Sequence, residues 1–206
     1  ENFNKNKEAY YGICATGTNL SITGNRGAIL KIEYHENAIE CKSLTIKDSV
    51  TVEAVSQGTC IYAGGDITIE GLGTLVNART TDIIKGQAAV STRGKLYVGE
   101  SSYLVTCSVA KSSSWERVGF YPNYPDTNYI SSLYVAGVAT VDGGIITAYF
   151  YKRKGSYINE YDYSIEDYGE TKAFYCHRLD INNGGEVNVF IERAEGKYPH
   201  KEYGFE

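Results

Sequence analysis

The amino-acid sequence predicts an all-β protein, a single-stranded right-handed parallel β-helix of about six coils. Two observations predict this fold. Short apolar segments alternate with polar residues at a period of two, which is typical of strands. The pattern returns about every 21 to 24 residues, which is typical of the coils of a solenoid that bury apolar rows against one another. The right hand follows from the strong preference of parallel crossover connections.

The repeat is clearest in residues 37–52 and 58–75. Each of these two stretches contains three short apolar segments, separated by Gly, Ser, Asp and Asn where the backbone must turn. Their leading apolar residues are Ile39, Leu44 and Val50 in the first stretch and Ile61, Ile67 and Leu75 in the second. We therefore expect three strands of three to five residues in each coil, with inward side chains stacked in rows.

Four further coils continue the same pattern along the chain. Their leading apolar residues are Ile13, Leu20 and Leu30 in the first coil, Val90, Leu96 and Leu104 in the fourth, Leu133, Ala139 and Ile146 in the fifth, and Phe174, Leu179 and Val187 in the sixth. In the sixth coil Ile181 is also predicted to point inward, two residues after Leu179. The charged tail of residues 193–206 is predicted to cover part of the last coil.

One repeat runs through most of the chain, which predicts a single domain over residues 1–206. Two connections are about twenty residues longer than the others, over residues 111–129 and 151–171. Both follow the third strand of one coil and precede the first strand of the next. Because insertions at one phase of a solenoid emerge at one edge, we expect the two insertions to pack together as a single lobe.

Composition and charge exclude several classes of partner. A formal net charge of −5 disfavours binding to nucleic acid, which requires a basic surface. No apolar run is long enough to insert into a membrane. The sequence contains no methionine and no signal peptide, which predicts a mature or excised fragment of a secreted or cell-surface protein.

The chain has five cysteines and no Cys-x-x-Cys motif of the kind used for zinc or redox chemistry. The coil alignment predicts that Cys41 and Cys176 point inward and that Cys14 and Cys60 have the opposite phase. Cys14 and Cys60 lie two coils apart, so about 9 to 10 Å would separate them. That separation is too long for a disulfide, and we expect free thiols.

The insertions are rich in aromatic residues, which is the main functional signal of the sequence. The candidate carbohydrate-binding residues are Trp115, Tyr121 and Tyr124 in the first insertion and Tyr157 and Tyr161 in the second. Tyrosine and tryptophan rings pack on the apolar face of a sugar while their polar groups hydrogen-bond its rim. An alternative interpretation is that these aromatic residues form a small separate hydrophobic core that packs the insertions against the coils.

The second insertion also carries acidic residues, of which Glu160 and Asp162 are candidate calcium ligands. Their spacing does not match an EF-hand loop, and a solvated acidic loop beside Lys152 and Arg153 is the alternative.

Catalytic residues are not indicated. The three histidines, His35, His177 and His200, are scattered and lie in no hydrolase or metalloprotease motif. The sequence therefore predicts a protein that is not an enzyme.

The segments Ala38-Ile-Glu-Cys, Leu44-Thr-Ile and Gly65-Asp-Ile-Thr-Ile-Glu-Gly-Leu-Gly-Thr-Leu give the chain a family resemblance. It resembles the right-handed β-helix carbohydrate-binding domains of bacterial surface proteins, which are shaped like pectate lyases. The resemblance implies a fold and a polysaccharide ligand, and in places calcium. It supports a non-catalytic polysaccharide-binding module of a secreted or surface protein. An adhesive solenoid that docks a protein partner is the alternative, and a polysaccharide lyase is a third hypothesis.

Overall fold

The computed structural model describes residues 11–34, 37–83, 87–110, 130–152, 171–192 and 202–205, and these residues form strands and short turns without a helix. The strands belong to two sheets, and every strand pairing described is parallel. The all-β class is therefore confirmed. The arrangement is compatible with a parallel β-solenoid.

Sheet A has nine strands and sheet B has six. Sheet A comprises β1 (Tyr11–Thr23), β3 (Asn37–Lys47), β5 (Ile61–Ala63), β6 (Ile67–Ile69), β8 (Ala88–Thr92), β9 (Leu96–Val98), β11 (Ile130–Asp142), β13 (Thr171–Asn182) and β15 (Glu202–Phe205). Sheet B comprises β2 (Ile29–Tyr34), β4 (Thr51–Ser56), β7 (Leu75–Ile83), β10 (Tyr103–Ala110), β12 (Ile145–Lys152) and β14 (Glu186–Glu192).

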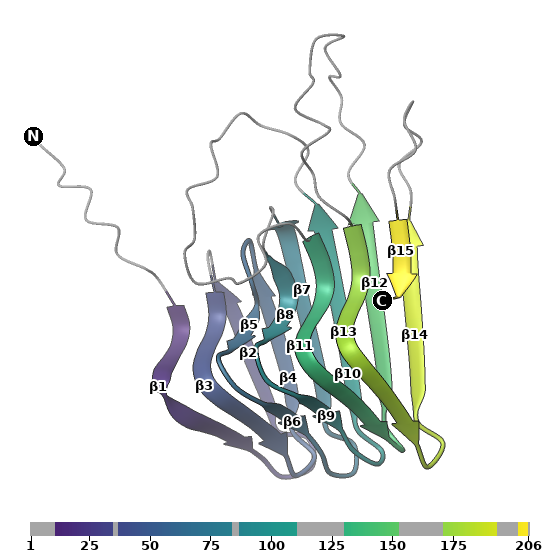
Figure 1. Ribbon diagram of the computed structural model, residues 1–206. Helices are drawn as coiled ribbons and strands as arrows, with labels where there is room; N and C mark the ends of the chain where they lie inside the picture. The colour runs from purple at the N-terminus through teal and green to yellow at the C-terminus, as the bar shows by residue number, and fades with distance from the viewer. Residues whose placement is uncertain are drawn as a thin grey trace, which may run out of the picture.

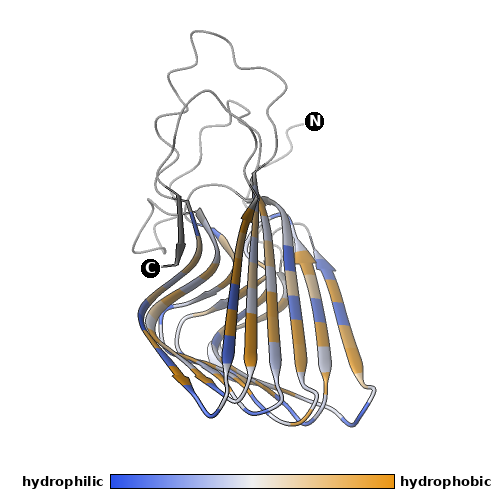
Figure 2. Ribbon diagram, turned by 90° about the vertical axis from the view of Figure 1, so that its right-hand side faces the viewer, coloured by the Kyte–Doolittle hydropathy of each residue, from blue (hydrophilic) through white to orange (hydrophobic). Residues whose placement is uncertain are grey.

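The chain passes through sheet A and then through sheet B six times before it ends in β15. We call each such passage a coil. Figure 1 shows the coils side by side in sequence order, and Figure 2 shows sheet A curving round to meet the flatter sheet B. This order agrees with the six repeats expected from the sequence.

Sheet A bends in the middle of each coil. The expectation of three separate short strands is met in the third and fourth coils, where β5 and β6, and β8 and β9, are distinct. In the other coils a single long strand crosses the bend, as β1 and β11 do over 13 residues each. The register shifts at the bend, between Ala15 and Asn19 and between Val135 and Val138, while pairing continues on both sides. Continued pairing satisfies the backbone groups and therefore favours one bent strand over two short ones.

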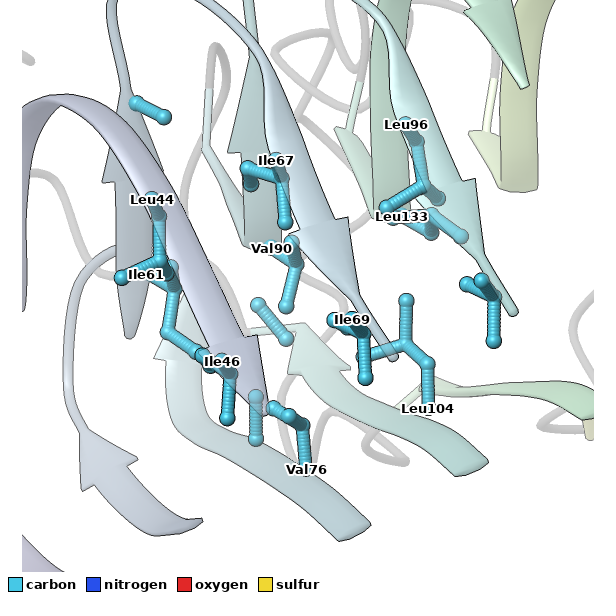
Figure 3. Close-up of a cluster of buried hydrophobic side chains, with 14 of the residues drawn as sticks. Leu44, Ile46, Ile61, Ile67, Ile69, Val76, Val90, Leu96, Leu104 and Leu133 are labelled. Atoms are coloured by element: carbon cyan, nitrogen blue, oxygen red, sulfur yellow. The ribbon is translucent and has the colours of Figure 1, made fainter. Parts of the chain in front are cut away.

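The core lies between the two sheets and consists of aliphatic rows (Figure 3). Leu44, Ile67 and Leu96 are register partners in successive coils, and each is about 1% exposed. Ile39 and Ile61 pair in the same way and are also buried. The predicted inward positions of these residues are confirmed.

Two inward assignments need correction at the sixth and third coils. Leu179 is partly buried against the core, but Ile181 is 48% exposed. The reason is that β15 pairs with Thr171, Lys172 and Phe174 of β13 and leaves the part of β13 that holds Ile181 uncovered among the described residues. In the third coil, Val76 rather than Leu75 is fully buried in the row of sheet B.

All five cysteines are free thiols, as expected. Cys41 and Cys176 are buried and Cys14 is exposed, but Cys60 is also buried, contrary to its predicted phase. Cys60 precedes β5 in a turn, where the alternation of a strand does not apply. There its Sγ receives a hydrogen bond from the Ser56 hydroxyl at 3.2 Å and donates one to the Arg79 carbonyl at 2.8 Å.

The attachment points of the two insertions lie side by side. Ala110 and Lys152, where β10 and β12 end, are register partners, and so are Ile130 and Thr171, where β11 and β13 begin. The attachment points of both insertions are therefore neighbours in the sheets. Of the predicted second insertion, 151–171, residues 151 and 152 belong to β12 and residue 171 to β13. Residues 111–129 and 153–170 lie outside the described part of the chain, so the insertions themselves stay a prediction.

Candidate functional site

The residues nominated from the sequence lie outside the described residues. This applies to the aromatic residues Trp115, Tyr121, Tyr124, Tyr157 and Tyr161, and to the acidic residues Glu160 and Asp162. The lobe that they were expected to form therefore stays a prediction. The described strands carry other aromatic side chains on the outer faces of both sheets, which sequence reasoning did not select.

The outer face of sheet B holds an aromatic cluster that we call the sheet B cluster: Tyr149 and Tyr151 in β12, and Phe190 in β14, beside β10. These strands are neighbours in the sheet (Figure 1). Phe190 is 49% exposed and the two tyrosines are half-buried, so the cluster is open to solvent at its Phe190 end. The inward residues of β12, Ile146, Ala148 and Phe150, are fully buried, which fixes the tyrosines on the outer face by alternation.

The rings of the sheet B cluster are parallel. Tyr149 and Phe190 have ring centroids 4.9 Å apart with an interplanar angle of 13°. Tyr149 and Tyr151 have centroids 6.2 Å apart at 10°. The first separation is close to the distance between adjacent strands, about 4.8 Å, so the rings stand upright on the sheet with their edges toward solvent.

Phe190 differs from the other rings because β14 is the last strand of sheet B in the described residues. One face of its ring covers Tyr149, and no further strand from the described ranges lies beside the opposite face. An apolar ring face of this kind can pack against another flat apolar surface.

Polar side chains occupy the neighbouring row of sheet B. Asn77, Thr147 and Asn188 follow one another across β7, β10, β12 and β14, with Val105 between the first two. Farther along this row Lys31 and Glu53 form an ion pair of 2.8 Å, and the Asn188 amide donates to Glu186 at 2.7 Å. The row offers amide and hydroxyl groups beside the rings, with its charges largely compensated.

A second aromatic row lies on the outer face of sheet A, where Tyr62, Ser91, Tyr134 and Tyr175 are register partners. Tyr134 and Tyr175 stack with centroids 5.0 Å apart at 8°. The Lys172 ammonium lies 4.9 Å from the centre of the Tyr175 ring, and Lys172 is only 1% exposed. A cation over an aromatic face is attractive, which helps to hold this lysine at the start of β13.

The cysteines and histidines of the described residues show no arrangement for nucleophilic catalysis. Burial, and then the Asp180 carboxylate, raise the pKa of Cys176 to about 11, so its thiol stays protonated near neutral pH. His177 is exposed, whereas Cys176 beside it is buried. His35 and His200 lie outside the described residues.

The described strands contain no group of three or more His, Cys, Asp or Glu side chains that could hold a metal ion. Within the same residues no helix is long and apolar enough to cross a lipid bilayer.

Comparisons with known proteins give no further assignment: no protein-family model, no curated protein and no solved structure matches this chain. The resemblance to carbohydrate-binding β-helix domains therefore keeps the status of an expectation. The fold itself defines the class of protein: it is an all-β protein built from two sheets of parallel strands.

A sequence signal for the described aromatic residues did exist. Tyr134 and Tyr149 each lie between two inward apolar residues of the predicted coils, which places them on the outer face. The aromatic residues of the insertions are concentrated in the sequence and therefore give a clear signal. Those of the coils are spread over the sequence and become neighbours only when the coils stack.

Proposed function

We propose that this chain is a right-handed parallel β-helix of about six coils that acts as a non-catalytic polysaccharide-binding module of a secreted or cell-surface bacterial protein. The observation that carries the proposal is the sheet B cluster, in which Phe190 and Tyr149 are stacked at 4.9 Å on an exposed sheet face. Such a face offers apolar contact area together with tyrosine hydroxyls.

In this proposal a sugar ring packs on the outer face of Phe190 at the edge of the sheet. The neighbouring sugars then contact the ring edges of Tyr149 and Tyr151 and hydrogen-bond with the polar row at Thr147 and Asn188. The fixed backbone of the paired strands holds these groups before the ligand arrives, which lowers the entropy cost of binding. The compensated charges of the polar row suit a neutral glycan.

The test removes the Phe190 ring and compares it with a matched residue. Phe190→Ala should weaken the binding of a neutral polysaccharide about tenfold, because burying ~60 Å² of ring at about 25 cal/mol per Å² corresponds to ~1.5 kcal/mol. Ile29→Ala is the control, since Ile29 is 58% exposed on β2 at the opposite edge of the same sheet. Affinity is measured by calorimetry with glycans selected on an array, and stability by thermal melting.

Unchanged affinity in Phe190→Ala would contradict the proposal, as would equal losses in both variants. A protein partner captured through the same face, with no glycan bound, would instead favour the adhesive alternative. Release of new reducing or unsaturated ends from a polysaccharide would show that the chain is a lyase or hydrolase.

A further inference from the structure

The bend of sheet A carries a row of outward residues that crosses five coils. Cys41, Ala63, Thr92, Val135 and Cys176 are register partners in successive coils. The residues that directly follow them are therefore neighbours along the bend. We call them the bend row: Lys42, Gly64, Arg93, Ala136 and His177. All are exposed except Ala136, which is half-buried.

Basic and small residues alternate in the bend row. Lys42, Arg93 and His177 lie in the second, fourth and sixth coils, and Gly64 and Ala136 lie between them. Adjacent coils are about 4.8 Å apart, so successive basic residues are about 9.6 Å apart along the axis. The two small residues leave room between the long basic side chains.

Most of the positive charge at the bend has no counter-ion in the described part of the chain. Among the described residues, Lys42, Arg93 and Lys95 have no ion-pair partner. Asp66 is the acidic residue of the bend itself, and its Oδ1 accepts the backbone N–H of Lys95 at 2.8 Å. Arg178, by contrast, forms an ion pair of 2.9 Å with Asp180. Within the described residues the uncompensated cations are thus Lys42 and Arg93 of the bend row and Lys95, two residues after Arg93 in the same coil, in a chain whose formal net charge is −5.

Tyrosines lie beside the bend row in the third and fifth coils, where its residues are the small Gly64 and Ala136. Tyr62 precedes Gly64 by two residues and Tyr134 precedes Ala136 by two, so both project from the same outer face. Burial raises the pKa of Tyr62, whereas the nearby Arg93 cation lowers it and Glu40 raises it. Cations and aromatic rings therefore alternate from the second to the fifth coil, with Glu40 at the far end of the tyrosine row. In the sixth coil Tyr175 and His177 lie on the same strand.

The backbone of the bend is closely packed, which fixes the spacing of these charges. A Cβ on Gly94 would lie 2.6 Å from the Gly65 carbonyl carbon and 2.7 Å from the Asp66 nitrogen. A Cβ on Gly137 would lie 2.7 Å from the Gly94 oxygen. The glycines thus let successive bends touch, and rigid spacing reduces the ordering cost of binding an extended polymer.

We propose that the bend row binds an anionic polysaccharide that runs along the solenoid axis. Its carboxylates lie at Lys42 and Arg93 of the row and at Lys95 beside Arg93, and its sugar rings lie beside Tyr62 and Tyr134. The two-coil spacing is close to the repeat of two sugars in an extended 1,4-linked chain. Nucleic acid fits less well, since each strand of a duplex carries one charge per about 3.4 Å, far denser than the row. The proposal takes the class of ligand from the proposed function but uses a different surface from the sheet B cluster.

The experiment measures binding of the whole chain to polygalacturonate and to the neutral polymer obtained by reducing its carboxylates. Arg93→Gln should weaken polygalacturonate binding about three- to fivefold, as expected for one exposed charge contact. Lys42→Gln, Arg93→Gln and Lys95→Gln combined should weaken it roughly thirtyfold if the sites act independently. Binding by the unmodified chain should fall steeply between about 50 mM and about 500 mM salt.

Lys31→Gln is the matched control, because it removes the same charge from sheet B and should change the affinity by less than about twofold. Phe190→Ala should leave polygalacturonate binding intact, which separates this proposal from that for sheet B. The proposal would be overturned if the chain did not bind polygalacturonate measurably, or if it bound the neutral polymer equally well. Equal effects of Arg93→Gln and Lys31→Gln on the affinity would also overturn it, as would tighter binding of a single-stranded oligonucleotide at equal charge. Thermal melting verifies that each variant is folded.

Discussion

Replacing Ile67 with aspartate tests the stacked core directly. Ile67 lies in β6 between its register partners Leu44 and Leu96, and it is 1% exposed (Figure 3). The substitution removes an aliphatic side chain from the middle of the row and introduces a carboxylate among side chains that are each about 1% exposed. Since each coil is stabilised by its neighbours, damage in the third coil affects the pairing on both sides.

The magnitude has two parts. Loss of the buried side chain costs about 2 to 5 kcal/mol, as for Ile→Ala in a packed core. Burying an unpaired polar or charged group adds several kcal/mol, even if the carboxyl becomes protonated. The sum is comparable with the whole stability of a typical domain, about 5 to 15 kcal/mol. We therefore expect Ile67→Asp to be largely unfolded and Ile67→Ala to be folded but clearly destabilised.

The assay is circular dichroism during thermal and urea denaturation. Ile29→Asp is the control, because Ile29 is also in a strand but is 58% exposed, and its substitution should change stability by less than about 0.5 kcal/mol. A melting curve of Ile67→Asp that matches the unsubstituted chain would refute the stacked core. Equal destabilisation by Ile67→Asp and Ile29→Asp would refute the assignment of inner and outer faces.

Two further predictions concern the bend and the thiols. Gly94→Ala should destabilise the protein by about 1 to 3 kcal/mol in urea denaturation, because the added Cβ meets backbone atoms of Gly65 and Asp66. Gly64→Ala is the control and should be tolerated, since the atom nearest to its added Cβ is 3.8 Å away. Similar losses of stability in the two variants would contradict the close packing at the bend. Under native conditions an alkylating reagent should modify the exposed Cys14 and spare Cys60, whose pKa burial raises to about 12, until denaturant is added; mass spectrometry that finds Cys60 modified first would show that its burial is wrong.

Much of the fold could be predicted because the coil repeats the same simple chemistry. Alternation of apolar and polar residues placed Ile39, Leu44 and Ile67 inward, and the structure confirms all three. The rule failed at two positions for different reasons. Cys60 lies in a turn, whereas Ile181 lies in β13 at the end of the stack, where β15 does not reach.

The candidate sites were harder to predict, since they are formed by residues from different coils. Tyr149 and Phe190 are distant in sequence and become stacked because β12 and β14 pair in one particular register. The basic residues of the bend row, Lys42 and Arg93, likewise align only because the register places the second and fourth coils on one line.

The sequence by itself determined that the chain is all-β and that its strands recur in coils, and it predicted two insertions at one edge. These properties follow from local periodicity and spacing, which each segment carries on its own. Only the tertiary structure decided that the first two strands of most coils join across a bend, and which outward side chains become neighbours. Pairing register decides this, and register depends on how the side chains of all coils pack together rather than on any one segment.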